Sequence, residues 1–403
     1  MKTHAISTTG EVAGGSAKTI EQVQLKATPR LLFVDNLRIF LTILVVLHHL
    51  MIIYAGSGGW IYQESRQDLA TAVLGKWFTS VNQSYFMGLF LLISAYFVPG
   101  SYDRKGAAVF LKDRLTRLGI PLAVYSWILR PALLYAGLAN YGDLNTSFLD
   151  WYAHQYFREY GLIGGGPLWF ISALLIFSIL YALWRKLVPR RPEALNRQIS
   201  FPGNSAIALF ALGIALISFL VRLWYPSDKV FTPLSFQFAD FPQYIALFVI
   251  GLVAYRLGWL VRLPERTGRV WMRIAIGLIL LYPPIVIFSG ALTEATPFLG
   301  GWHWQAFLAA TWQSFLGIAM CVTVLDLFRR RLDHQRGLSR FLSQNAYTVY
   351  LIHEPVITFV ALTATGLVLY PLLKFGLAAL VAVPLCFGLS SLIRRLPYTQ
   401  RVL

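Results

Sequence analysis

Long apolar runs separated by short polar segments dominate the chain. A helix needs about twenty predominantly apolar residues to cross the hydrocarbon core of a bilayer. Runs of this length lie near residues 34–54, 78–98, 119–138, 167–186, 205–224, 241–259, 273–291, 304–327, 345–365 and 372–393. The pattern predicts an all-α polytopic membrane protein, with about ten transmembrane helices forming one bundle around a central cavity.

The segments outside these runs are short. Residues 1–32 lack apolar periodicity and the apolar core of a signal peptide, so we expect a disordered cytosolic tail. Residues 33–393 are expected to form a single membrane domain, and residues 394–403 a cytosolic C-terminal tail. Residues 227–240, rich in Pro, Phe and Gln, are a candidate for a short interfacial helix.

Composition agrees with the apolar pattern. Of 403 residues, 57% are hydrophobic and 13% are charged, whereas a soluble domain carries roughly 25% charged residues. The two cysteines, Cys321 and Cys386, both fall inside predicted spans. We therefore expect them to be packing residues rather than a disulfide.

The net charge of +17 follows the predicted topology. With the N-terminus inside, 28 of the 35 Lys and Arg residues fall on the cytosolic side and 7 on the other. This bias obeys the positive-inside rule and places both termini in the cytosol. The charges thus indicate membrane orientation rather than nucleic-acid binding. The sequence shows no internal repeat, which argues against a repeat-built transporter.

One face of the first run carries two ionisable side chains. Arg38 and His49 are eleven positions apart, so on a helix they point within about 20° of each other. Their axial separation is roughly 16 Å, which puts Arg38 at the cytosolic mouth and His49 near the middle of the bilayer. Such groups usually line a bundle interior or a wet cavity. The residues alone leave open a purely structural alternative, in which Arg38 reaches the membrane interface and His49 donates a hydrogen bond to a neighbouring helix.

Five segments resemble, in order, those of acyltransferase family 3. The Asp35-Asn36-Leu37-Arg38 stretch with His49 resembles the opening of the family's first span. The other four segments are Phe86–Phe97, Lys112–Pro121, Gly166–Phe170 and Ser343–His353. The resemblance covers roughly residues 33–393. Two variants, Asp-Asn-Leu-Arg-Ile and Ser-Ala-Tyr, are closest to the branch that contains glucan biosynthesis protein C.

The resemblance implies an O-acyltransferase in the inner (cytoplasmic) membrane of a bacterium. Such an enzyme moves an acyl group, acetyl or succinyl, from cytosolic acyl-CoA to a hydroxyl of an envelope carbohydrate, such as a periplasmic glucan or O-antigen. Acyl-CoA would be a co-substrate, with no permanently bound cofactor and no metal. The expected partners are the lipid bilayer, acyl-CoA and the carbohydrate acceptor, with no nucleic acid.

Individual residues suit this reaction. A hydroxyl nucleophile needs a base that titrates near neutral pH, and His49 is the candidate. Whether it deprotonates the hydroxyl directly or carries the acyl group is left open. Arg114 and Arg117 are three apart at a predicted helix end and, with Arg38, are candidates for binding the CoA phosphates. Their alternative role is to anchor the third span.

A second polar group lies in the ninth run. Tyr350 and His353 share a helix face and are candidates to stabilise an oxyanion or orient the other histidine. A satisfied core polar cluster is the alternative. Supporting residues are expected among the neighbouring and matched positions: Asp35, His48, Ser94, Trp169, Tyr347 and Glu354.

Other aromatic and ionisable residues stay ambiguous. Trp302, His303 and Trp304 lie at the far interface, where an aromatic belt is typical, although aromatic faces also stack on sugars. Three residues in the longest outer loop are equally ambiguous: Trp151, His154 and Glu159.

Two other functions remain open. The first is a permease or exporter for a glycan or an acylated product, in which Arg38 and His49 line a substrate path. The second is an acyltransferase-like protein that only assists glycan export. A transporter would move its substrate without consuming a thioester.

Overall fold

Helices account for almost all regular structure in the computed structural model. It describes residues 30–56, 58–64, 68–142, 146–163, 165–188, 199–291, 294–397 and 399–403. Most of the predicted 1–32 tail therefore lies outside the described residues. Residues Leu32–Leu403 form one compact unit.

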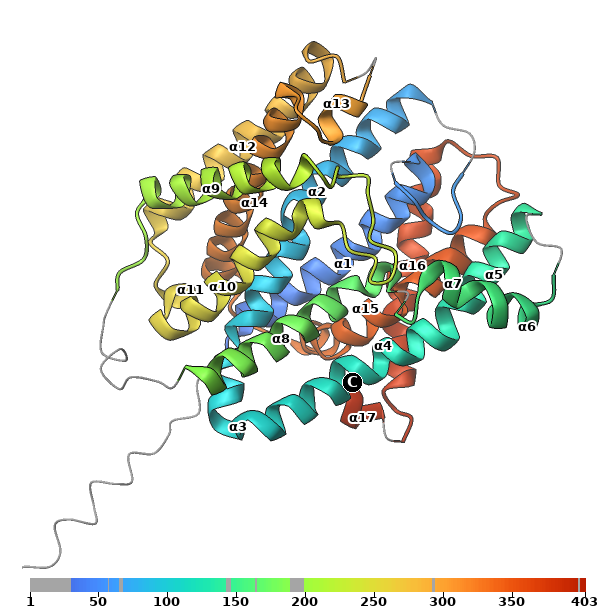
Figure 1. The fold of residues 1–403 in the computed structure, drawn as a ribbon, viewed down its shortest axis with the longest axis horizontal. Coiled ribbons are helices and arrows are strands. Elements are labelled where there is room, and N and C mark those ends of the chain that lie inside the picture. Colours follow the sequence, from blue (N-terminus) through green and yellow to red (C-terminus); the bar gives the residue numbers. More distant parts are fainter. Residues whose placement is uncertain are drawn as a thin grey trace, which may run out of the picture. The chain divides into compact units, whose positions relative to one another are not determined.

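The helices follow the predicted runs (Figure 1). The long helices are α1 (Leu32–Ala55), α2 (Leu69–Tyr96), α3 (Val98–Arg114), α8 (Trp169–Leu187), α9 (Asn204–Arg222), α10 (Phe241–Leu257), α12 (Glu265–Phe288), α14 (Trp304–Arg331), α15 (Gly337–Thr363) and α16 (Pro371–Ile393). The shorter ones are α4 (Ile120–Val124), α5 (Arg130–Tyr141), α6 (Phe148–Trp151), α7 (Phe157–Tyr160), α11 (Trp259–Arg262), α13 (Thr296–Leu299) and α17 (Thr399–Val402).

Nine helical segments within the described residues are long and apolar enough to cross a membrane. They coincide with nine of the ten predicted spans and confirm an all-α polytopic membrane protein. The exception is α2, the helix over the predicted 78–98 span. The polar run Asn82-Gln83-Ser84 lowers the mean hydropathy of this helix. A membrane helix can carry these residues because they face protein rather than lipid: Asn82 and Ser84 are buried.

The third predicted span is longer than expected. A helical path runs from Val98 to Ala139, where the sequence indicated only residues 119–138. Two π-helical turns, η1 (Leu115–Gly119) and η2 (Tyr125–Leu129), interrupt this path. Each lies just before a proline, Pro121 or Pro131, whose missing N–H favours such an irregularity. The basic residues of 104–117 hid this extension from an apolar scan.

Helices α1 and α15 are neighbours and run in the same direction, although they are about 300 residues apart in sequence (Figure 1). Asn36 donates to the backbone carbonyls of Leu332 and His334, just before α15 begins. Helix α16 packs on both helices. Its Phe387 shares an apolar core with Leu50 and Ile53 of α1 and Ile357 of α15. This three-helix core holds α1 and α15 in register.

The basic segments gather at one end of the bundle. Asp103 forms ion pairs with Arg185 at 3.6 Å and Arg256 at 2.6 Å. At the same end Arg329 donates to the carbonyl of Leu263, and Arg394 donates to that of Gln344. The segments predicted to share the cytosolic side therefore contact one another, while their orientation in a membrane stays a prediction.

A buried polar network joins α2, α9, α10 and α14. Arg222 lies 3.4 Å from Asp240, and Gln313 and Gln83 donate to the same carboxylate at 2.8 and 3.0 Å. The network satisfies charges that would otherwise be costly inside a bilayer. Asp240 is the last residue of the 227–240 segment, for which the prediction of a short interfacial helix is wrong. This segment forms turns, with an isolated bridge between Phe231 and Phe236 and a 3₁₀ turn at Phe238–Asp240.

Glycine permits a close helix contact between α2 and α10. Helix α10 packs along α2, and a Cβ at Gly251 would overlap the backbone oxygen of Leu92. A carbonyl oxygen in a helix cannot move aside easily. Small residues allow such close approach in membrane bundles.

Gly251→Ala is expected to destabilise the protein by about 1–3 kcal/mol, because the methyl group overpacks a rigid backbone contact. Thermal unfolding of the purified protein in detergent measures the effect. Gly213→Ala on α9 is the control, since nothing lies within 4 Å of that position. Equal melting temperatures for both variants would contradict the close packing of α2 and α10.

Candidate active site

Two histidines from distant parts of the chain stack face to face. The rings of His49 on α1 and His353 on α15 have centroids 5.2 Å apart and planes 19° apart. The indole of Trp60 stacks on His49 as well, with centroids 4.3 Å apart and planes 27° apart. His49 thus has an aromatic neighbour on α15 and another in the segment after α1. These contacts fix the plane of its ring.

Hydrogen bonding distinguishes the two rings. His353 Nδ1 lies 2.6 Å from the backbone oxygen of Tyr350. Because a carbonyl oxygen only accepts, Nδ1 carries the proton, and in a neutral ring Nε2 keeps its lone pair. Within the described part of the chain, His353 Nε2 and His49 Nδ1 are buried with no hydrogen-bond partner. His353 is fully buried, whereas His49 keeps some accessible surface. His49 is therefore the more accessible of the two rings.

His48 lies beside this pair but faces α2. Its ring meets His49 edge-on at 5.4 Å and packs 4.8 Å from the ring of Phe86. It is buried among apolar groups. Its contacts suit the supporting role that the sequence predicted, because it braces His49 from the side.

Three arginines gather near the start of α1. Arg38 lies 3.2 Å from Asp35, and its guanidinium covers the ring of Phe97 at 4.9 Å. Arg114 interacts electrostatically with both Arg38 and Arg117. The structure thus brings together three side chains from two motifs that are about 75 residues apart in sequence.

One face of α15 connects the arginines to the histidines. Tyr347 donates its hydroxyl proton to the backbone oxygen of Arg117. Tyr350 follows one turn later, and His353 follows after another turn, beside His49. On α1, Arg38 lies near Arg114 at the basic end, and His49 lies beside His353. The two parallel helices therefore carry matched polar stripes from the basic end into the bundle.

Tyr350 ties this stripe to a third motif. Its hydroxyl donates to the backbone oxygen of Pro167, and its ring packs between Phe90 and Phe170. This arrangement uses the hydroxyl proton to hold the Gly166–Leu168 turn (η4) against α15. An oxyanion role for Tyr350, as the sequence suggested, needs that bond to open, and the role stays a prediction.

Glu354 forms an ion pair that the sequence did not reveal. Arg130 Nη1 lies 3.4 Å from Glu354 Oε1, and the two side chains are 13% and 2% exposed. Gly166 has φ of 43°, and a Cβ there would overlap the Arg130 guanidinium. Only glycine thus suits this position. The signal for Arg130 was an arginine inside a predicted span, which usually marks a polar interior.

Other predicted residues lie outside this cluster. Trp169 stacks on Tyr244 at 5.1 Å, and the Ser94 carbonyl accepts a bond from the Phe97 backbone at the end of α2. Trp302 and Trp304 are exposed at 81% and 62%. The outer-loop residues behave differently from one another: Trp151 is buried, Glu159 is exposed, and His154 is exposed beside Asp150.

Trp60 is the contact that sequence analysis missed altogether. It follows Gly58 and Gly59 in a short segment between α1 and α2, where no spacing rule links it to His49. A buried ion pair fastens the same segment, with Lys374 of α16 lying 2.7 Å from Glu64. A lysine in a predicted span was again the available signal.

Comparison with known proteins supports the sequence resemblance. The glucans biosynthesis proteins C of Escherichia coli strain K12 and of Escherichia coli O157:H7 are each 22% identical to this chain over 349 residues. The match covers 81% of this chain and 82% of each relative. No solved structure matches.

The family comparison spans nearly the whole membrane unit. The model of the family's acyltransferase domain matches residues 31–391, a range that includes both stacked histidines and the three arginines. The chain therefore belongs to acyltransferase family 3.

Proposed function

We propose that this protein transfers an acyl group, acetyl or succinyl, from cytosolic acyl-CoA to a hydroxyl of an envelope or periplasmic carbohydrate. The observation that carries the proposal is the pair of matched stripes on α1 and α15. They join an arginine cluster at the basic end to a histidine pair inside the bundle. The relatives named for glucan biosynthesis favour a carbohydrate acceptor. The proposed location is the bacterial inner membrane.

The arginine cluster suits the phosphates of coenzyme A. Arg38 has Asp35 beside it, whereas neither Arg114 nor Arg117 forms an ion pair in the described ranges. Arg114 is repelled by both Arg38 and Arg117. The nearby acids are Asp35 and Asp113, so the cluster keeps a net positive charge that an anion relieves. Arginine also binds phosphate through two parallel hydrogen bonds. From this mouth, the long pantetheine arm of the donor would extend along α1 and α15 toward His49, roughly 16 Å away.

His49 would act as the general base. Its ring accepts the proton of the acceptor hydroxyl while the hydroxyl oxygen attacks the thioester carbonyl carbon. The carbon–sulfur bond then breaks, and the CoA thiolate takes up the proton from the imidazolium. Trp60 and His353 would hold the ring in position through both steps. The same position of His49 also suits a transient acyl-imidazole, with the carbohydrate hydroxyl attacking in a second step.

His49→Ala is expected to lower glycan acylation by about 10²–10⁴-fold while the protein still inserts, because the general base is lost. The assay is acyl transfer by purified protein in liposomes, with acetyl-CoA or succinyl-CoA as donor and a periplasmic glucan as acceptor. His154→Ala is the matched control, since His154 is exposed and outside the cluster. Wild-type turnover in His49→Ala would refute the assignment.

The same liposomes separate the enzyme from a permease. An acyltransferase releases free CoA thiol in proportion to the acylated glycan. Without the acceptor, release over many turnovers is not expected. A permease or exporter would move the glycan across the bilayer while leaving the thioester intact.

Arg114→Ala is expected to raise the KM for acyl-CoA by about tenfold or more, with a smaller effect on kcat. One charged contact to phosphate is lost, and such contacts contribute about 1.5–3 kcal/mol. Steady-state kinetics with varied acyl-CoA measures the change. Arg269→Ala provides the control, because Arg269 pairs with Glu265 and is distant in sequence from the arginine cluster. An unchanged KM in Arg114→Ala would exclude this arginine from donor binding.

A further inference from the structure

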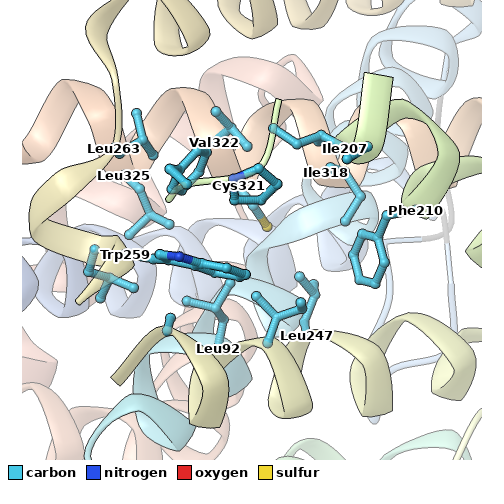
Figure 2. A pocket seen from close by; sticks show the side chains of 16 residues that line it. Leu92, Ile207, Phe210, Leu247, Trp259, Leu263, Ile318, Cys321, Val322 and Leu325 are labelled. Carbon is cyan, nitrogen blue, oxygen red and sulfur yellow. The ribbon is translucent and has the colours of Figure 1, made fainter. Parts of the chain in front are cut away.

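An apolar cavity lies among the helices of the middle part of the chain, away from α1 and α15. It has a volume of about 270 Å³ and is lined by residues of α2, α9, α10, α11 and α14 (Figure 2). None of the residues that line it belongs to the candidate active site. Figure 2 shows the Cys321 sulfur pointing into the space, with Trp259 and Phe210 on two of its sides.

The lining excludes a polar ligand. Every residue around the cavity is apolar or a free cysteine, among them Leu92, Leu247 and Val322. A sugar or nucleotide would leave its hydroxyls or phosphates without hydrogen bonds there, at a cost of several kcal/mol. The volume falls just below that of ordinary small-molecule sites, about 300–1,000 Å³. A slender hydrocarbon chain fits both constraints.

The cavity opens where lipid is available. Ala206, on its rim near the start of α9, is exposed. The next turns of α9 present large apolar side chains outward, with Leu209 68% and Leu216 46% exposed. Such a surface on a membrane helix faces acyl chains. A lipid tail therefore reaches the opening laterally, from within the bilayer.

The charges at the rim select the headgroup. Arg262 directly precedes Leu263, which lines the cavity, and Arg266 follows Leu263 by three residues in the first turn of α12; both arginines are exposed. Acidic residues pair with neighbouring arginines: Glu265 with Arg269 and Asp326 with Arg329. By contrast, Arg262 and Arg266 form no ion pair in the part of the chain that the structure describes. Uncompensated arginines beside a lipid-accessible cavity attract an anionic headgroup.

The wall that carries these arginines is held in place before any ligand binds. Arg329 donates to the carbonyls of Val261 and Leu263, the first at 2.9 Å. Trp259 donates to the carbonyl of Ile199 at 3.3 Å. A preformed site avoids the entropy cost of ordering a loop on binding.

We infer that this cavity binds one acyl chain of an anionic phospholipid, with the headgroup phosphate on Arg262 and Arg266. The inference is independent of the acylation reaction. The bound molecule would be a structural lipid of the leaflet at the basic end, held among α2, α9, α10, α11 and α14. The anionic surface of that leaflet is where polybasic segments bind in other membrane proteins.

Native mass spectrometry of the purified full-length protein tests the site, with phosphatidylglycerol and phosphatidylcholine of identical chains as probes. Wild-type protein is expected to prefer phosphatidylglycerol. Replacing both arginines, by Arg262→Ala and Arg266→Ala, should weaken the binding of phosphatidylglycerol about fivefold per arginine. The control variant Arg340→Ala should leave this binding unchanged. Ala206→Trp should abolish binding of the tail by closing the opening, while Leu209→Trp, on the same helix but outside the cavity, should not.

Several results would overturn the inference. Equal binding of the two lipids would remove the headgroup contact. Phosphatidylglycerol binding that persists in Ala206→Trp would place the lipid elsewhere. A stable dimer without lipid would show that a second copy covers this face. Because Ala206 and the two arginines are exposed, the variants are expected to keep the elution volume and melting temperature of the wild type.

Discussion

A charge inside a bilayer must have a partner or a polar cavity, and this constraint organises the bundle. The buried ion pairs join separate segments of the chain: Arg130 with Glu354, Arg222 with Asp240 and Lys374 with Glu64. Each pair removes a cost of several kcal/mol that either charge alone would bring. The arginines near the mouth of α1 differ, because Arg114 and Arg117 have no acid in an ion pair among the described residues. Their charge is available for a ligand.

The parallel packing of α1 and α15 turns this charge pattern into a site. The shared core with α16 sets their register, so that His49 and His353 meet at one level and the arginine cluster and Tyr347 meet at another. The arginine cluster and the histidine pair are thereby separated along one axis. This arrangement suits an enzyme whose two substrates come from opposite sides of a membrane.

The sequence predicted most of the helices and part of the site. Apolar runs locate spans because both the lipid-facing and the packed sides of a membrane helix are mostly apolar. The eleven-residue spacing places Arg38 and His49 on one side of α1. The extension of the third span was hidden by its basic residues. His353 was a candidate to orient His49, but the stacking of the two rings could not be predicted, since it depends on the tertiary packing of α1 against α15. Trp60 and Arg130 were missed for the same reason: their contacts lie across the bundle, outside any local spacing rule.

A determined structure with a non-transferable acyl-CoA analogue tests the central claim most directly. The account predicts the nucleotide phosphates on Arg38, Arg114 and Arg117, with the thioester-equivalent carbonyl carbon near His49. The acyl arm should lie along the facing sides of α1 and α15. An analogue bound at another opening, or a His49 ring turned toward lipid and away from His353, would contradict it.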